Sequence, residues 1–138
     1  GAALEQDDGN GNRVRIAFAS KTLCESRSHY CATKKELYAI VFFMRYFVGF
    51  YRGQTVHIRT DHSALRWLWN FSGVVDSMYY RWITEMENYH PWTIEYVPGD
   101  KNVVADALSR KNKPTVVRPY KDCKIADCEI CKFHFRKK

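Results

Sequence analysis

Three acidic side chains occupy positions where a carboxylate could do chemistry. Glu36 lies in the segment KKELYAI, Asp61 ends QTVHIRTD, and Asp106 lies within NVVADALSR. Each of them also has an ordinary structural explanation. Thr33 to Glu36 fits the S/T-x-x-E capping box, and Asp61 would stand at a helix start, where aspartate is a favoured N-cap. The local patterns leave both explanations open.

Asp106 has the strongest structural explanation of the three. It lies on the polar side of the short helix predicted for NVVADALSR, where Asn102 would cap the helix and Arg110 follows four residues later. The residues expected to form the buried stripe are Val103, Val104, Ala107 and Leu108. Taken alone, this pattern favours an ordinary solvated carboxylate.

Three carboxylates that a fold brings together would repel one another unless cations neutralise them. Oxygen ligands suit Mg²⁺, which binds through few carboxylates plus substrate phosphates. Two such ions about 4 Å apart can activate water and stabilise a leaving oxygen in phosphodiester hydrolysis. The remaining acids have weaker claims: Asp7 and Asp8 belong to a predicted hairpin turn, and Asp76, Glu85 and Glu87 to a solvated helix face.

The elements that must position these residues follow a mixed α/β order. GAALEQ and RVRIAFASKTL predict two strands joined by a turn rich in Gly and Asn. Residues 32–51 have helical periodicity, and Gly53 ends that helix. QTVHIRTD and WTIEYV predict strands; HSALRWLWNF, VVDSMYYRWITEMENY and NVVADALSR predict helices. The apolar stripe expected on the long helix consists of Leu37, Ile40, Val41, Met44, Val48 and Tyr51.

The basic residues are concentrated after residue 110. Residues 1–110 carry 13 Lys or Arg against 12 Asp or Glu, whereas residues 111–138 carry 9 against 3. We therefore expect one domain over 1–110 and a basic, cysteine-containing linker or tail over 111–138, which would attract polyanions.

No apolar run is long enough for a membrane span, and five cysteines without disulfide-scaffold density favour an intracellular protein that is not secreted. The start at GAALEQ, without Met, suggests a piece of a longer chain.

Two further groups of residues have alternative explanations. Cys123, Cys128, Cys131 and His134 form C-x4-C-x2-C-x2-H, which contains half of a zinc-site spacing but matches no common finger, so free thiols in a linker are the default. The four tryptophans could stack on nucleotides but are more often core residues in such elements: Trp67, Trp69, Trp82 and Trp92.

Three segments together resemble a known family. IAFASKTL, HYCATKKELYAIVFFMRYFVGFYRGQTVHIRTDHSALRWL and RWITEMENYHPWTIEYVPGDKNVVADALSR are similar to the ribonuclease H domain of reverse transcriptases from Ty3/gypsy-type long-terminal-repeat retrotransposons. The likeness covers nearly all of residues 1–110 in unbroken order. It implies a ribonuclease H-like α/β fold, with a mixed central sheet flanked by helices and a truncated first strand.

The resemblance also implies a function and a site. The family's catalytic residues match Glu36, Asp61 and Asp106. In the family such carboxylates hold two Mg²⁺ ions, with Mn²⁺ as a substitute, and cleave the RNA strand of RNA–DNA hybrids to leave 3′-hydroxyl and 5′-phosphate ends. The implied partners are the hybrid and the polymerase and integrase parts of the same Pol polyprotein, in a cytoplasmic particle or the nucleus.

Two departures from the family pattern matter. The family's first aspartate lies in a D-A-S-like strand a few residues before the segment matching GAALEQ, so this chain carries three of four ligands and we expect weak activity from it alone. Tyr96 stands where some related nucleases have an auxiliary histidine, although a half-buried strand tyrosine is the favoured interpretation. His62 is interpreted as a helix-start residue.

Two rival hypotheses remain. The chain could be a catalytically dead ribonuclease H-like module that serves structure or nucleic-acid binding, and the residues before Gly1 would distinguish the two. A transposase or integrase core is the weaker rival, because such enzymes end their acidic set with a glutamate where NVVADALSR has aspartate.

Overall fold

The computed structural model describes residues 1–65 and 76–110. Its elements are β1 (Ala2–Asp7), β2 (Arg13–Ala19), α1 (Glu25–Ser28), α2 (Ala32–Tyr51), β3 (Val56–Thr60), α4 (Ser77–Met86), the 3₁₀ turn η1 (Glu87–Tyr89), β4 (Trp92–Tyr96), the 3₁₀ turn η2 (Gly99–Lys101) and α5 (Val103–Arg110). The expected mixed α/β order is therefore confirmed in the described residues. The zinc candidates, Trp67, Trp69 and most of the predicted helix HSALRWLWNF lie outside them.

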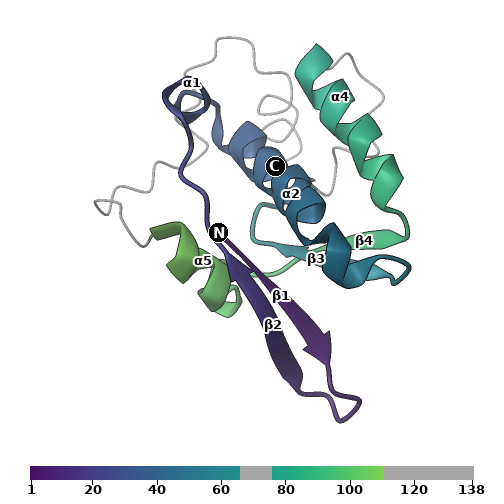
Figure 1. The fold of residues 1–138 in the computed structure, drawn as a ribbon. Helices are drawn as coiled ribbons and strands as arrows, with labels where there is room; N and C mark the ends of the chain where they lie inside the picture. The colour runs from purple at the N-terminus through teal and green to yellow at the C-terminus, as the bar shows by residue number, and fades with distance from the viewer. Residues whose placement is uncertain (66–75, 111–138) are drawn as a thin grey trace.

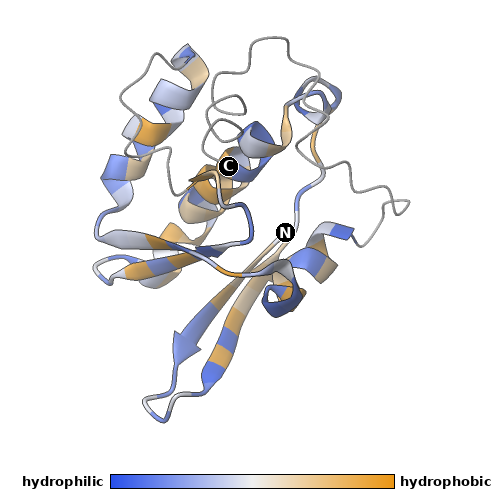
Figure 2. Ribbon diagram, turned by 180° about the vertical axis from the view of Figure 1, so that it is seen from behind, coloured by the Kyte–Doolittle hydropathy of each residue, from blue (hydrophilic) through white to orange (hydrophobic). Residues whose placement is uncertain are grey.

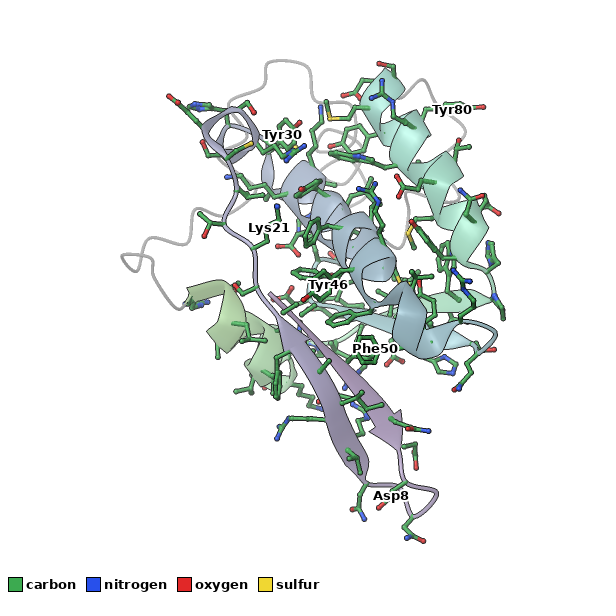
Figure 3. The ribbon with its side chains drawn as sticks, viewed as in Figure 1. Asp8, Lys21, Tyr30, Tyr46, Phe50 and Tyr80 are labelled. Carbon is green, nitrogen blue, oxygen red and sulfur yellow. The ribbon has the colours of Figure 1, made fainter. Side chains whose placement is uncertain are left out.

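Strands β1 and β2 form the predicted antiparallel hairpin, whose register runs from Ala2 opposite Ala19 to Asp7 opposite Arg13. In the connecting turn the Asp8 carboxylate accepts hydrogen bonds from the backbone of Asn10 and Asn12, at 2.8 and 3.1 Å. Asp8 thus lies at the tip of the hairpin and serves the turn, as Figure 3 shows.

Helix α2 spans the residues that the periodicity predicted. It ends at Tyr51, and Gly53 then adopts a φ of 81°, a backbone conformation that residues other than glycine rarely adopt. The start of the helix corrects one expectation. Its N-cap is Cys31, not Thr33, so the predicted capping box between Thr33 and Glu36 does not form.

The core lies along α2, which packs against α4 and both pairs of strands, and Figure 1 shows α2 and α4 side by side. The buried members of this cluster are Leu37, Val41, Phe43, Met44, Phe47, Tyr51, Leu65, Tyr79, Trp82 and Met86. Trp82 is thus a core residue, as expected, and the indole of Trp92 donates to the carbonyl of Met86 at 2.8 Å. From the predicted α2 stripe, Ile40 and Val48 are only half-buried.

Helix α4 also corrects an expectation. Asp76 does not belong to a solvated helix face but is the N-cap of α4, accepting hydrogen bonds from the backbone of Met78 and Tyr79 at 2.9 and 3.1 Å. Its other oxygen lies 3.1 Å from the ammonium of Lys34, which links the start of α4 to α2.

No helix in the described residues is long and apolar enough to cross a membrane.

The sheet departs from the expected single mixed sheet. The described strands form two separate sheets of two strands each, the antiparallel β1–β2 hairpin and the parallel pair β3–β4. Both pack on α2 through apolar residues such as Leu4 and Ile58, but β1 and β3 share no ladder of hydrogen bonds. Strands must lie about 4.8 Å apart to pair, and the hairpin extends away from β3 in Figure 1.

Helix α5 turns only part of the predicted stripe inward, with Val104 and Leu108 half-buried as expected. Val103 is 62% exposed and Ala107 is exposed too, whereas Val104, Ala105 and Leu108 are half-buried. The reason is where the helix docks. A Cβ atom on Gly1 would collide with Leu108, and the Ser20 hydroxyl donates to the Leu108 carbonyl at 3.0 Å. The Leu108 side of the helix therefore packs on the hairpin, and Figure 2 shows α5 beside the hairpin.

Candidate active site

A broad cleft separates the two sheets. Every residue of β1 and of β3 lines it, whereas β2 and β4 contribute only Arg13, Arg15, Ile16 and Glu95. Because successive side chains on a strand point to opposite faces, an unbroken run of lining residues means that the backbone edges of β1 and β3 border the cleft. Its volume is about 2170 Å³, and it extends along the whole length of β1 and β3.

All three carboxylates singled out in the sequence line this cleft. Glu36 comes from the second turn of α2, Asp61 follows the last residue of β3, and Asp106 lies in the first turn of α5. Three elements far apart in the chain therefore contribute one of these acidic residues each to the cleft, which Glu5, Asp7 and Glu95 also line.

Glu36 and Asp61 are close enough to interact electrostatically. Burial, followed by the negative charge of Asp61, raises the pKa of the Glu36 carboxyl to about 7, and the positive N-terminal amine of Gly1 partly opposes this rise. A carboxyl pair of this kind holds a proton more tightly because two adjacent negative charges are unfavourable. A bound cation would remove that penalty.

Asp61 is exposed, unlike the residues on either side of it. Within the described part of the chain its carboxylate accepts no hydrogen bond, so the predicted N-cap interaction is absent there. The turn η2 approaches from the end of β4: a Cβ atom on Gly99 would lie 3.4 Å from Asp61 Oδ2. Asp61 is thus a solvated carboxylate at the carboxyl end of a parallel strand, a common location for ligand-binding groups in α/β folds.

Asp106 is held by its own helix. Arg110 Nε lies 2.8 Å from Asp106 Oδ1, which is the i,i+4 pair expected from the spacing in NVVADALSR. Among residues 1–65 and 76–110, no group of three His, Cys, Asp or Glu side chains is close enough to hold one metal ion. The structure therefore couples Glu36 with Asp61 and leaves Asp106 in the same cleft, engaged with Arg110.

The secondary candidates have different positions. Tyr96 lies on β4 opposite Thr60 and does not line the cleft; at 41% it is exposed, so the expectation of a half-buried strand tyrosine was wrong. His62 is buried, and its Nε2 atom lies 2.9 Å from the hydroxyl of Thr33. The interpretation of His62 as a simple helix-start residue missed this contact, since no local pattern links two residues that are 29 positions apart.

Comparison with known proteins decides the family. Residues 1–89 match the family described as the RNase H-like domain found in reverse transcriptase. The chain belongs to this family. Helix α2, strand β3 and the residues Glu36 and Asp61 all lie within the residues that match this RNase H-like domain.

The relatives of this RNase H-like domain are retrotransposon polyproteins of the gypsy group. It is 39% identical over 110 residues to the retrovirus-related Pol polyprotein from transposon 297 of Drosophila melanogaster, which covers 80% of this chain and 10% of the relative. The Pol polyprotein from transposon 412 of the same fly is 36% identical over 110 residues, covering 80% and 9%. The Pol polyprotein from transposon gypsy, also from this fly, is 34% identical over 101 residues, covering 70% and 9%.

The domain spans about a tenth of the length of these curated relatives. No solved structure matches it. The resemblance drawn from the sequence motifs is therefore confirmed at the level of family and of element type. The family match does not extend to Asp106, which lies beyond residue 89.

Proposed function

We propose that this domain hydrolyses the RNA strand of RNA–DNA hybrids as the ribonuclease H part of a retrotransposon reverse transcriptase, with Glu36, Asp61 and Asp106 as its catalytic carboxylates. The observation that carries the proposal is the pair Glu36 and Asp61 at the cleft between β1 and β3, where burial and the negative charge of Asp61 raise the pKa of Glu36 to about 7. A perturbed carboxyl in a cleft, beside a second carboxylate, is typical of a functional site.

The donor set fits Mg²⁺. The three side chains offer only carboxylate oxygens, which hard cations such as Mg²⁺ prefer, with Mn²⁺ as a substitute. Glu36, Asp61 and Asp106 would hold the ions, and Asp106 would become available on release from Arg110. When bound, such ions neutralise the carboxylates and the scissile phosphate and lower the pKa of water.

The protein's own contribution is placement and charge. α2 and β3 hold Glu36 and Asp61 together, so that the repulsion between them is already present before the ions bind and is relieved by binding. η2 borders Asp61 at Gly99 and limits the space on that side. The carboxylate of Asp106 enters from α5, whose Arg110 can neutralise it until a cation competes.

The cleft also carries cations that suit a nucleic-acid backbone. Its lining residues include Arg13, Lys21, Lys35 and Lys101. Lysine and arginine bind phosphates without reading sequence, in a salt-dependent manner. A hybrid would be recognised by backbone shape and the RNA 2′-hydroxyl.

The relative from transposon 297 is a longer polyprotein of which this chain covers 10%, and we propose that residues preceding this domain in such a polyprotein complete the site. The N-terminal amine lies close enough to Glu36 to affect its pKa, so the preceding residues would enter the cleft beside Glu36. The bordering edges of β1 and β3 leave room there for a further strand. The family pattern assigns the first aspartate to that strand. The natural protein would then combine four carboxylates.

The test is cleavage of a labelled RNA–DNA hybrid with Mg²⁺, comparing the 138-residue chain with a protein extended upstream by its natural residues. We expect the extended protein to cut, leaving 3′-hydroxyl and 5′-phosphate ends, and the shorter chain to cut weakly or not at all. If both fold and neither cuts, the domain is instead a ribonuclease H-like module that binds nucleic acid or supports the polymerase.

The gypsy-group relatives extend the proposal to context. We propose that the domain acts within a Pol polyprotein, beside polymerase and integrase parts, in an intracellular particle or the nucleus. The basic segment 111–138 would connect it to the following part and add phosphate contacts.

A further inference from the structure

The Asp61 turn is anchored to α2 through its two neighbours. Thr60 and His62 are 4% and 9% exposed, although Asp61 between them is exposed. The backbone N–H of His62 donates to the Thr60 hydroxyl at 3.2 Å, which closes a small turn around Asp61. The backbone that carries the Asp61 carboxylate is therefore fixed from both sides.

The anchor on the helix is Thr33. Its side chain is fully buried, and its hydroxyl lies 2.9 Å from Nε2 of His62. Thr33 lies one helical turn before Glu36, so both project from the same side of α2. The contact thus joins the turn that carries Asp61 to the turn of the helix that carries Glu36.

We propose that the Thr33–His62 hydrogen bond is a positioning contact that sets the separation of Glu36 and Asp61. Both carboxylates come from elements that otherwise meet through apolar packing, which is less directional than a hydrogen bond. A small change in the spacing of two metal ligands costs affinity, because ligands must lie within a few tenths of an ångström of their preferred distances. This inference rests on the proposed function.

The simpler explanation is that Thr33 and His62 pair only because buried polar groups need partners. The two explanations differ in what the loss of the hydroxyl would change. A purely structural bond would affect stability alone, whereas a positioning bond would also affect metal affinity.

The test uses the natural protein, with the residues that precede Gly1, in three variants. Thr33→Val keeps the shape of the side chain and removes the hydroxyl, and Thr33→Ser keeps the hydroxyl. Tyr51→Phe is the matched control, because it deletes another buried hydrogen bond from α2, the 2.7 Å bond from the Tyr51 hydroxyl to the Met44 carbonyl. Tyr51 also lines the cleft, but it lies at the opposite end of α2 from Glu36 and is not a proposed metal ligand.

The readouts are Mn²⁺ affinity without nucleic acid, the Mg²⁺ concentration that half-saturates hybrid cleavage, and Tm. We expect Thr33→Val to weaken Mn²⁺ binding about 10-fold or more, as removal of an outer-shell partner does, and to raise the half-saturating Mg²⁺ concentration. Thr33→Ser should restore both values. Tyr51→Phe should lower Tm and leave both values unchanged.

Equal effects of Thr33→Val and Tyr51→Phe, with unchanged metal affinity, would overturn the positioning role while leaving the proposed function intact. Wild-type protein that neither binds Mn²⁺ nor cuts would overturn both. If Thr33→Val does not fold, His62→Gln and His62→Leu give the same comparison, since only the glutamine amide can still reach Thr33.

Discussion

The carboxyl group of Glu36 on α2 and the carboxylate of Asp61 at the end of β3 are electrostatically coupled, although 25 positions separate them in the chain. The coupling raises the pKa of Glu36 in addition to the effect of burial. Unfavourable groups of this kind are often kept where function requires them, because stability alone would remove them.

The first prediction concerns stability and pH. The pKa of Glu36 is about 7 in the folded protein, whereas a glutamate outside the fold has a pKa of 4.5. Between these two pH values the folded state therefore keeps a proton on Glu36 that the unfolded state has lost. The favourable contribution of Glu36 is therefore complete below about pH 4.5 and is lost as pH rises through 7. In urea denaturation without metal, the free energy of unfolding of Glu36→Gln relative to wild type should rise by about 2 to 3 kcal/mol as the pH increases from 4.5 to 7. Exposed Glu25→Gln is the control, and an equal gain there would contradict the prediction.

The second prediction concerns Asp61. Asp61→Asn should reduce Mg²⁺-dependent cleavage by the upstream-extended protein more than about 100-fold, beyond the 10–100-fold typical of residues that only support a metal ligand. The free energy of unfolding should change by less than about 1 kcal/mol, because Asp61 is exposed and accepts no hydrogen bond within the described residues. Cleavage assays and urea denaturation measure the two effects. Undiminished cleavage would remove Asp61 from the site.

The third prediction concerns the competition for Asp106. Removing Arg110 with Arg110→Gln should lower the Mg²⁺ concentration that half-saturates cleavage by about twofold, which corresponds to the 0.3–0.5 kcal/mol of an exposed i,i+4 ion pair. Arg45→Gln is the control, since it breaks the Arg45–Glu85 pair, neither member of which lines the cleft. A higher Mg²⁺ requirement in Arg110→Gln would mean that Arg110 supports the site.

The fourth prediction concerns the core that holds α2. Leu37 has no exposed surface and lies one position after Glu36, so Leu37→Ala should cost about 2–5 kcal/mol of unfolding free energy. Val103→Ala on α5 should change it by no more than about 0.5 kcal/mol, since Val103 is 62% exposed. Denaturant unfolding compares the two, and a large loss in Val103→Ala would show that α5 docks through the face predicted from its sequence.

The fifth prediction concerns the basic segment. Deleting residues 111–138 removes 9 Lys or Arg and should weaken hybrid binding at low salt, with the difference shrinking as salt rises. Filter binding or fluorescence anisotropy over a salt series measures this. A loss of affinity that persists at high salt would show that the segment makes contacts other than those to phosphates, for example through a folded zinc site.

The sequence by itself determined the elements whose signals are local. The periodicity of residues 32–51 predicted α2, the Gly- and Asn-rich turn predicted the hairpin, and the motif around NVVADALSR predicted the i,i+4 pair of Asp106 and Arg110. These interactions form between near neighbours, so their patterns are legible in the chain. The motifs also named the three carboxylates, through the family they resemble.

The tertiary structure decided what depends on distant partners. The Thr33 hydroxyl contacts His62 instead of capping α2. Helix α5 packs Leu108 against Gly1 and leaves Val103 exposed. β1 and β3 border a common cleft without pairing. Glu36 acquires a pKa of about 7 because the fold partly buries it beside Asp61. Burial and charge proximity are properties of the packed chain, so no local pattern encodes them.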